Sequence, residues 1–184
     1  MDKVFIPSGG KAKPEFTCDP VPIVWTKEIP FYYSGQKEAV EKGISLKYQA
    51  LFCEPRTGKT IVSLTIAYSR LLAGVVDQIV IVCPASLQEN WREDIRRYYP
   101  DADMRRFLIL SAHSLSFDSS LEQTLKKFGQ AKGIRQLIYD ESHLFKTNSA
   151  KRTRNIRKYI DNDYAMTLTG TEVERSLADV YHQY

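Results

Sequence analysis

The sequence predicts an α/β fold in which a mostly parallel sheet has helices on both faces. Short apolar, β-prone runs alternate with helical patterns along the chain, and this alternation is typical of parallel strands joined by crossover helices. The chain has 184 residues, of which 43% are hydrophobic and 26% are charged, as in ordinary globular proteins. This length predicts one domain, and this composition excludes a disordered or fibrous protein.

A proline-rich arm is expected over residues 1–30, with the main domain over residues 31–184. Five of the eight prolines lie in the arm, together with Gly9 and Gly10. Proline fixes φ and lacks a backbone N–H group, so this stretch favours neither a helix nor a central strand. At most one edge strand is expected there.

Five strands and three helices are expected after the arm. Each strand is a short apolar run, and the runs are ALFC (50–53), IVIVC (79–83), FLIL (107–110), QLIY (136–139) and AMTL (165–168). The first two helices are expected over residues 35–48 and 60–73.

The third helix follows the second apolar run and has the clearest pattern. Ser86 followed by Glu89 predicts a capping box at its start, and Pro100 ends it. Trp91 could stack on a nucleic-acid base, but its place on the apolar stripe favours packing in the core. The stripe, at spacings of four, four and three, consists of Leu87, Trp91, Ile95 and Tyr98.

The cysteine content indicates neither a disulfide framework nor a zinc ribbon. Cys18, Cys53 and Cys83 form no C-x-x-C pair, and the last two are expected to be buried strand residues. Every apolar stretch is far shorter than the about 20 residues of a membrane span, and the N-terminus lacks the apolar core of a secretory signal. We therefore expect an intracellular protein, cytoplasmic or nuclear, with no membrane partner.

A phosphate-binding loop is predicted at LFCEPRTGKT, residues 51–60, which follows a strand and precedes a helix. Gly58 lets the backbone approach an anion, and the helix start offers unpaired N–H groups and a positive dipole end. Lys59 would hold the β and γ phosphates, and Thr60 would offer its hydroxyl to Mg²⁺. Cys53 stands at the first glycine of the strict pattern G-x-x-x-x-G-K-[ST], and a chance match is the alternative.

An acidic pair, Asp140 and Glu141, follows the apolar run in QLIYDESHLFK. Ligands of open α/β sheets bind at the carboxyl ends of the strands, so we expect this pair and Lys59 to share one crevice. Asp140 is suited to hold Mg²⁺ through water, and Glu141 to orient and partly deprotonate the water that attacks the γ phosphate. The alternative, a solvated acidic turn, is disfavoured by the phosphate loop upstream.

The order of four motifs resembles the first RecA-like lobe of superfamily-two helicases and translocases, most closely that of SWI/SNF-type ATPases. The resemblance covers roughly residues 31–184. It implies a RecA-like P-loop NTPase fold and a motor that couples ATP hydrolysis to movement on DNA. The matching segments are TGKT (57–60) for motif I, VCPASLQENW (82–91) for motif Ia, DESH (140–143) for motif II and LTGT (168–171) for motif III.

The resemblance also implies a role for each matching residue. ATP would be bound by Gln36, Arg56, Thr57, Gly58, Lys59 and Thr60, Mg²⁺ by Thr60 and Asp140, and hydrolysis would need Lys59, Asp140 and Glu141. Coupling between nucleotide and nucleic acid would involve His143, Thr169, Gly170 and Thr171. Contacts with nucleic acid are implied for Pro84, Ala85, Ser86, Ser111, Lys146, Asn148, Arg152 and Arg154.

Several of these assignments have alternatives. Ser34 and Gly35 separate Gln36 from the aromatic residues before it, so Gln36 is equally explained as a helix-start glutamine. Ser111 also fits an ordinary polar loop. Arg56 stands where the family has glycine, and it could reach a phosphate, lie over the base or clash with the usual nucleotide pose. Glu172 replaces the proline that usually follows motif III.

Nucleic acid is the expected partner, although the net charge of the chain is only +4. Residues 131–160 hold eight Lys or Arg against two acidic residues, so contacts with a polyanion should concentrate there. A solvated helix face is the alternative for this cluster. Double-stranded DNA is favoured because motif Ia resembles the SWI/SNF type, and single-stranded DNA and RNA stay open.

A second RecA-like lobe, which supplies an arginine finger in this family, is expected from the same longer polypeptide. The chain ends at Tyr184, soon after motif III, so the isolated lobe should hydrolyse ATP slowly. One alternative function is a non-hydrolysing RecA-like module that binds DNA or a protein partner. Another is a P-loop kinase or unrelated NTPase, which motifs Ia and III disfavour.

Overall fold

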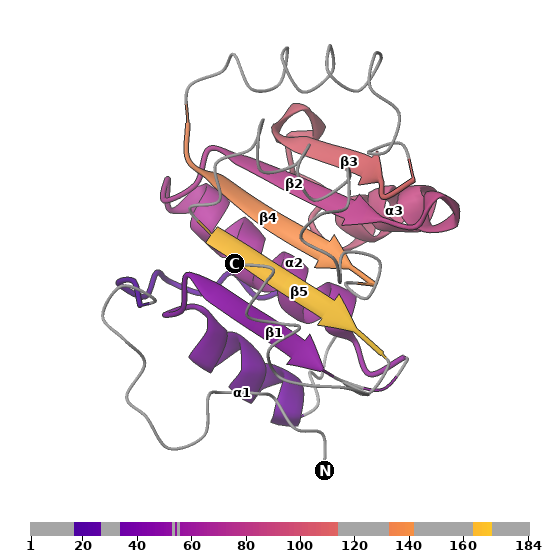
Figure 1. Ribbon diagram of the computed structural model, residues 1–184. Helices are drawn as coiled ribbons and strands as arrows, with labels where there is room; N and C mark the ends of the chain where they lie inside the picture. The colour runs from indigo at the N-terminus through magenta and orange to yellow at the C-terminus, as the bar shows by residue number, and fades with distance from the viewer. Residues whose placement is uncertain are drawn as a thin grey trace, which may run out of the picture.

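Five parallel strands form one sheet in the order β1-β5-β4-β2-β3 (Figure 1). The structure, a computed structural model, describes residues 17–26, 34–52, 54, 56–113, 133–141 and 164–170. Each of the apolar runs identified in the sequence is one of these strands, so the predicted parallel α/β fold is confirmed. The strands are β1 (Tyr48–Phe52), β2 (Gln78–Cys83), β3 (Phe107–Ser111), β4 (Arg135–Asp140) and β5 (Tyr164–Thr169).

Three α-helices pack in one core against one face of the sheet. They are α1 (Ser34–Gly43), α2 (Lys59–Leu72) and α3 (Gln88–Tyr98). Every residue of α2 from Ile61 to Leu71 is buried, because this helix lies between the sheet and its two neighbours. Among the described helices, none is long and apolar enough to cross a membrane.

The other face of the sheet has its own apolar core, which includes Val80, Val82 and Leu137. These three side chains are fully buried, as expected for parallel strands that are covered on both faces. The described helices α1, α2 and α3 all pack on the first face, so helices on the second face stay a prediction.

The end of the first helix differs from the prediction. The helix was expected to reach residue 48, but α1 ends at Gly43 and β1 begins at Tyr48. A Cβ atom at Gly43 would lie 2.2 Å from Gln49 Oε1 and 2.7 Å from Ile66 Cδ1, so the chain passes closely over β1 and α2 there. Close packing against residues distant in sequence therefore sets this boundary.

The predicted capping box of the third helix is wrong. A 3₁₀ turn, η2 (Ala85–Leu87), precedes α3, so Ser86 lies inside this turn and not at the N-cap. The N-cap is Leu87, which makes no side-chain capping bond. Glu89 pairs instead with Arg92 at 3.1 Å and with Arg96 at 3.4 Å.

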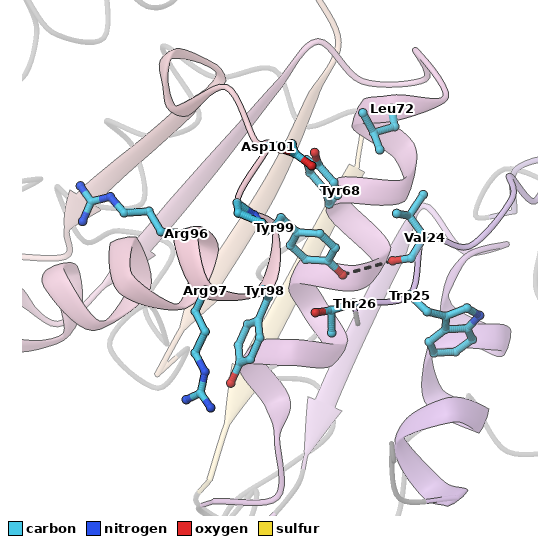
Figure 2. A pocket seen from close by; sticks show the side chains of 11 residues that line it. Val24, Trp25, Thr26, Tyr68, Leu72, Arg96, Arg97, Tyr98, Tyr99 and Asp101 are labelled. Carbon is cyan, nitrogen blue, oxygen red and sulfur yellow. Dashed lines mark hydrogen bonds between the residues drawn. The ribbon is translucent and has the colours of Figure 1, made fainter. Parts of the chain in front are cut away.

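The described part of the arm lies against the helices. Residues 18–26 form neither helix nor strand. The Val24 amide donates to Ser69 Oγ at 2.9 Å, and the Val24 carbonyl lies 3.3 Å from the Tyr99 hydroxyl (Figure 2). Val21 and Ile23 also pack on the helix core, so the arm contributes to it. The boundary at residue 30 stays a prediction.

A buried arginine on α2, which the sequence analysis missed, joins four elements. Arg70 is 1% exposed, and burial lowers its pKa. Its Nη1 donates to Gln136 Oε1 on β4 at 2.6 Å. Its Nη2 lies 3.1 Å from the Gly43 carbonyl and 3.3 Å from that of Ile44, at the end of α1. The guanidinium also lies 4.6 Å from the centre of the Tyr164 ring on β5.

Candidate active site

The carboxyl ends of all five strands lie at the same level, and most of the described candidate residues follow them. This alignment is fixed by the strand register. Motifs I, III, II and Ia, and the turn after β3, therefore open on one edge of the sheet (Figure 1). The register pairs near this edge are Phe52 with Thr169, Leu168 with Asp140, Val82 with Tyr139 and Cys83 with Ser111.

The phosphate loop closes tightly at the start of α2. Gly58 is the N-cap residue and has a φ of 86°, a left-handed conformation that favours glycine. Lys59 Nζ donates to the Glu54 carbonyl at 3.0 Å, and Thr57 Oγ1 donates to the same oxygen at 2.7 Å. The loop therefore brings the lysine ammonium and the N–H groups of the first helical turn to one place, which suits a phosphate.

Gln36 lies beside this loop. It belongs to the first turn of α1, as the helix-start interpretation requires, and its Nε2 donates to the Thr57 carbonyl at 2.7 Å. A Cβ atom at Gly58 would lie 2.2 Å from the same Nε2, so only a glycine leaves room for this contact. The structure thus brings Gln36 next to motif I, although 21 residues separate it from Thr57.

Two residues of the candidate site carry unusual backbone angles. In the described part of the chain, the non-glycine residues with positive φ are Arg56, at 66°, and Glu141, at 54°. This conformation is costly for residues with a Cβ atom, and such strain concentrates at functional sites. The left-handed angle at Arg56 also explains why glycine suits this position in the related motif.

Asp140 is held at both carboxylate oxygens. Its Oδ2 accepts a hydrogen bond from Trp91 Nε1 at 2.9 Å, and its Oδ1 accepts one from the Glu141 amide at 3.1 Å. Burial raises the pKa of Asp140, while the Trp91 hydrogen bond and the positive charge of Lys59 act to lower it. Lys59 is therefore near enough for its charge to act on Asp140, and a crevice shared by the two side chains stays a prediction.

The described residues supply donors that suit Mg²⁺ bound together with a nucleotide. None of them forms a group of three His, Cys, Asp or Glu side chains that could hold a metal ion. Mg²⁺ is usually bound by one or two carboxylates together with substrate phosphates. Asp140, the last residue of β4, provides one carboxylate, and Thr60 in the first turn of α2 provides one hydroxyl at the same edge of the sheet.

The candidate nucleic-acid contacts lie further along the same edge. Ala85 and Ser86 are exposed and Pro84 is half-buried, in the turn between β2 and α3. Ser111 ends β3, and its Oγ accepts a hydrogen bond from the His113 amide at 3.2 Å.

Motif III ends β5 between the phosphate loop and Asp140, where Thr169 is buried and Gly170 is half-buried. The remaining predicted residues lie outside the described residues, and these are Cys53, His143, Lys146, Asn148, Arg152, Arg154 and Thr171.

Trp91 is 2% exposed, which confirms the prediction that it packs in the core. Its hydrogen bond to Asp140 was missed, because the helical pattern places the residue on a face but does not identify its partner. The expected burial of Cys83 is also confirmed.

A separate cavity of about 500 Å³ lies at the opposite ends of α2 and α3. Its lining includes Tyr68 and Leu72 near the end of α2 and Trp25 of the arm (Figure 2). Tyr68 is the lining residue of α2 that is nearer to the loop, and it follows Lys59 by nine residues, or about 14 Å along the helix. The cavity is therefore not part of the candidate active site.

Curated relatives match this chain over two thirds of its length. The "DNA repair and recombination protein RAD54B" of Gallus gallus is 26% identical over 142 residues, covering 67% of this chain and 15% of the relative. The "ISWI chromatin-remodeling complex ATPase CHR17" of Arabidopsis thaliana is 26% identical over 144 residues, covering 67% of this chain and 13% of the relative. The chain thus spans only about one seventh of the length of these proteins.

A solved structure shares the fold. The "Sulfolobus solfataricus SWI2/SNF2 ATPase core in complex with dsDNA" has a TM-score of 0.61 and 16% sequence identity, covering 91% of this chain and 36% of that one. The family model described as SNF2-related domain matches residues 36–182, which include all five strands and the candidate site. One of the matched relatives is an ATPase by name. Because the family model covers most of the sequence, the chain belongs to the SNF2-related domain family.

Proposed function

We propose that this chain is the first ATP-binding lobe of a motor that couples hydrolysis of Mg-ATP to movement along double-stranded DNA. The observation that carries the proposal is the shared edge of the sheet. The phosphate loop after β1 and the acidic pair, which begins with the last residue of β4, are separated there only by the end of β5. The charge of Lys59 also acts on Asp140 across this gap. This arrangement suits phosphoryl transfer, which depends on positioning and charge stabilisation.

Each side chain has a separate role in the proposed reaction. Lys59 and the N–H groups at the start of α2 bind the β and γ phosphates. Thr60 and Asp140 would hold Mg²⁺, which neutralises phosphate charge when it is bound. Glu141 directly follows Asp140, so its carboxylate orients the attacking water and accepts its proton. Gln36 holds the loop through Thr57 and is the candidate for contact with the adenine.

The DNA partner is supported by the exposed turn and by the relatives. In the turn at residues 84–86, Ala85 and Ser86 are exposed, and small side chains with backbone N–H groups suit phosphate oxygens. One relative is a DNA repair and recombination protein, and the SWI2/SNF2 core was solved with double-stranded DNA. We propose that this chain also binds double-stranded DNA, with Arg152 and Arg154 as further phosphate contacts.

A second RecA-like lobe belongs to the proposal. Related phosphoryl-transfer enzymes gain roughly 10³ to 10⁵ in rate from an arginine finger. We propose that such an arginine comes from a second lobe of the same longer polypeptide, which also completes the DNA track. An intracellular location stays a prediction.

Nucleotide binding is the first test, because it does not require turnover. Mg-ATP is expected to raise the melting temperature of the chain, and Lys59→Ala is expected to abolish this shift because the phosphates lose their main positive charge. Lys42→Ala is the control, since Lys42 lies exposed at the far end of α1. A full thermal shift in Lys59→Ala would refute the phosphate loop.

Phosphate release from Mg-ATP, with and without duplex DNA, then tests hydrolysis. Turnover that DNA stimulates and that Glu141→Gln lacks is expected, slowly for this lobe and faster once a second lobe is joined. Equal turnover in wild type and Glu141→Gln would contradict the role of Glu141. Lys59-dependent nucleotide binding without turnover, even with a second lobe, would favour the non-hydrolysing module.

A further inference from the structure

One hydrogen bond connects the candidate metal carboxylate to the helix that follows the DNA-facing turn. Trp91 Nε1 donates to Asp140 Oδ2 at 2.9 Å, across 49 residues of sequence. Trp91 is the fourth residue of α3, and the turn at residues 84–86 precedes this helix, with Leu87 between them. This hydrogen bond therefore links the predicted metal-binding carboxylate to the helix that follows the predicted DNA contact.

The chemistry of the Trp91 indole and the Asp140 carboxylate suits a role of Trp91 in orienting this carboxylate. An indole has one N–H donor and no acceptor, so a buried tryptophan needs an acceptor such as a carboxylate oxygen. The Trp91 bond occupies one lone pair of Oδ2, and the Glu141 amide occupies one of Oδ1. Each oxygen keeps a further lone pair for a metal ion or its bound water. The two hydrogen bonds thus fix the orientation of the carboxylate and leave lone pairs available for a metal ion.

The helix that carries Trp91 is itself firmly attached. Gln88 Nε2, at the start of α3, donates to the Ile109 carbonyl of β3 at 3.1 Å. Ile95, one turn after Trp91, is fully buried in the helix core. Because α3 is one continuous helix, a displacement of its first turn reaches Trp91 about one turn later and with it the carboxylate.

We propose that Trp91 is a positioning residue that orients the Asp140 carboxylate for the magnesium-bound nucleotide and couples it to the DNA-facing turn. Nucleotide at the phosphate loop and DNA at the turn then influence each other through α3. The proposal rests on the proposed function, because it takes Asp140 as the metal carboxylate. Partners of metal ligands commonly change metal affinity by about 10- to 100-fold when they are replaced.

The first experiment measures the magnesium requirement of nucleotide binding. A non-hydrolysable ATP analogue is titrated with Mg²⁺, and the thermal shift is followed in wild type, Trp91→Phe and Ile95→Val. Trp91→Phe keeps a large ring and removes the N–H group, so the half-saturating Mg²⁺ concentration is expected to rise about tenfold. Binding of the analogue without Mg²⁺ should not change, because Lys59 and the start of α2 are untouched.

Ile95→Val is the matched control, because it removes one methyl group from the same helix and leaves the indole in place. It should lower the melting temperature without changing the Mg²⁺ requirement. An equal rise in Ile95→Val and Trp91→Phe, or no rise in Trp91→Phe, overturns the positioning role. If wild type itself shows no Lys59-dependent binding, the proposed function fails, and this inference fails with it.

Indole fluorescence gives a second readout that does not require Trp91→Phe to fold. The chain has two tryptophans, and Trp25 lies at the cavity away from the phosphate loop. In a Trp25→Phe protein, Trp91 is the only indole. Its emission should change saturably with Mg²⁺ plus the analogue, and Lys59→Ala should abolish the change. An emission that stays constant while the analogue binds overturns the proposal.

Coupling to DNA is measured on the same proteins. Duplex DNA is expected to alter the affinity for the magnesium-bound analogue in wild type by about 5-fold or more, a usual size for coupling between two sites. Trp91→Phe should reduce this factor towards one, while Ile95→Val should keep it. The same factor in wild type and Trp91→Phe would overturn the coupling role.

Discussion

At the scale of single residues, backbone strain marks the two loops of the candidate site. Arg56 in the phosphate loop and Glu141 after β4 both have left-handed φ angles. A Cβ atom makes this conformation cost roughly 1–2 kcal/mol, which the rest of the fold must offset. Glu141, the proposed base, is thus one of the two residues at which the fold tolerates this strain.

At Arg56 the strain can be measured through stability alone, because two variants that both lack the side chain differ only in how well they tolerate the left-handed angle. Arg56→Gly and Arg56→Ala both remove the side chain, but only glycine relieves the left-handed backbone. The glycine variant is therefore expected to be more stable than the alanine variant by about 1 kcal/mol. Denaturant unfolding of the two variants measures the difference. Equal free energies of unfolding would show that the angle costs nothing.

Cys83 offers a prediction from its surroundings. Burial, with the nearby charge of Asp140, raises the pKa of its thiol to about 12. The thiolate is the reactive form, so native protein at pH 8 should leave Cys83 unmodified by iodoacetamide. Peptide mass spectrometry measures the modification, and protein unfolded in guanidinium is the positive control. Rapid labelling of Cys83 in the folded state would contradict its burial.

The same shift has a consequence for stability. In the unfolded chain the thiol loses its proton near pH 9, while the folded state keeps it until about pH 12. The folded state then binds more protons, so the contribution of Cys83 to the free energy of unfolding falls as pH rises through this window.

At the scale of elements, Arg70 joins α2, the end of α1, β4 and β5. Arg70→Met is expected to lower the free energy of unfolding by about 3 kcal/mol or more, because buried carbonyls lose a charged donor. Arg70→Lys should recover only part of this, since an ammonium cannot reproduce the planar fork. Denaturant unfolding measures both variants.

Arg92→Met is the control for Arg70. Arg92 forms a surface pair with Glu89, and such pairs contribute about 0–1 kcal/mol. If Arg70→Met cost no more than Arg92→Met, the contacts of Arg70 would be incidental to stability.

The strands could be predicted from the sequence because each contains a short apolar run, and the runs of β2, β4 and β5 are almost wholly buried. Helix boundaries were harder. The end of α1 depends on the close approach of Gly43 to Gln49 and Ile66, which no local pattern contains. The start of α3 was wrong because the serine that resembles a cap lies inside a 3₁₀ turn.

In the candidate site, too, local motifs could be predicted from the sequence and contacts between distant residues could not. The phosphate loop and the acidic pair could be found because each is a short motif beside a strand. The bond between Trp91 and Asp140 could not, because it depends on β4 lying next to β2 in the sheet. The contact between Arg70 and Gln136 spans 66 residues and depends on the same strand order.

At the scale of the whole molecule, the proposed DNA contact depends on the positive charge of the basic cluster as well as on the edge of the sheet where the strands end. Replacing Arg152 and Arg154 with alanine is expected to weaken binding of duplex DNA. It should also reduce the slope of log affinity against log salt by about two, because two phosphate contacts are lost. Fluorescence anisotropy over a range of salt concentrations measures both effects.

A double replacement of Lys37 and Lys42 on α1 removes the same charge from an exposed helix surface. It should leave the salt slope near that of wild type. An unchanged slope in the Arg152 and Arg154 variant would instead identify the basic cluster as an ordinary solvated surface.

The position of β1 in the sheet has a consequence for synthesis of the protein on the ribosome. β1 pairs with β5, so Tyr48 cannot form this pairing until Ala165 has been synthesised. β2 and β3 are close in sequence and can pair much earlier. In a nascent chain, the strand that leads into the phosphate loop would therefore take its place in the sheet only after β5 has left the ribosome.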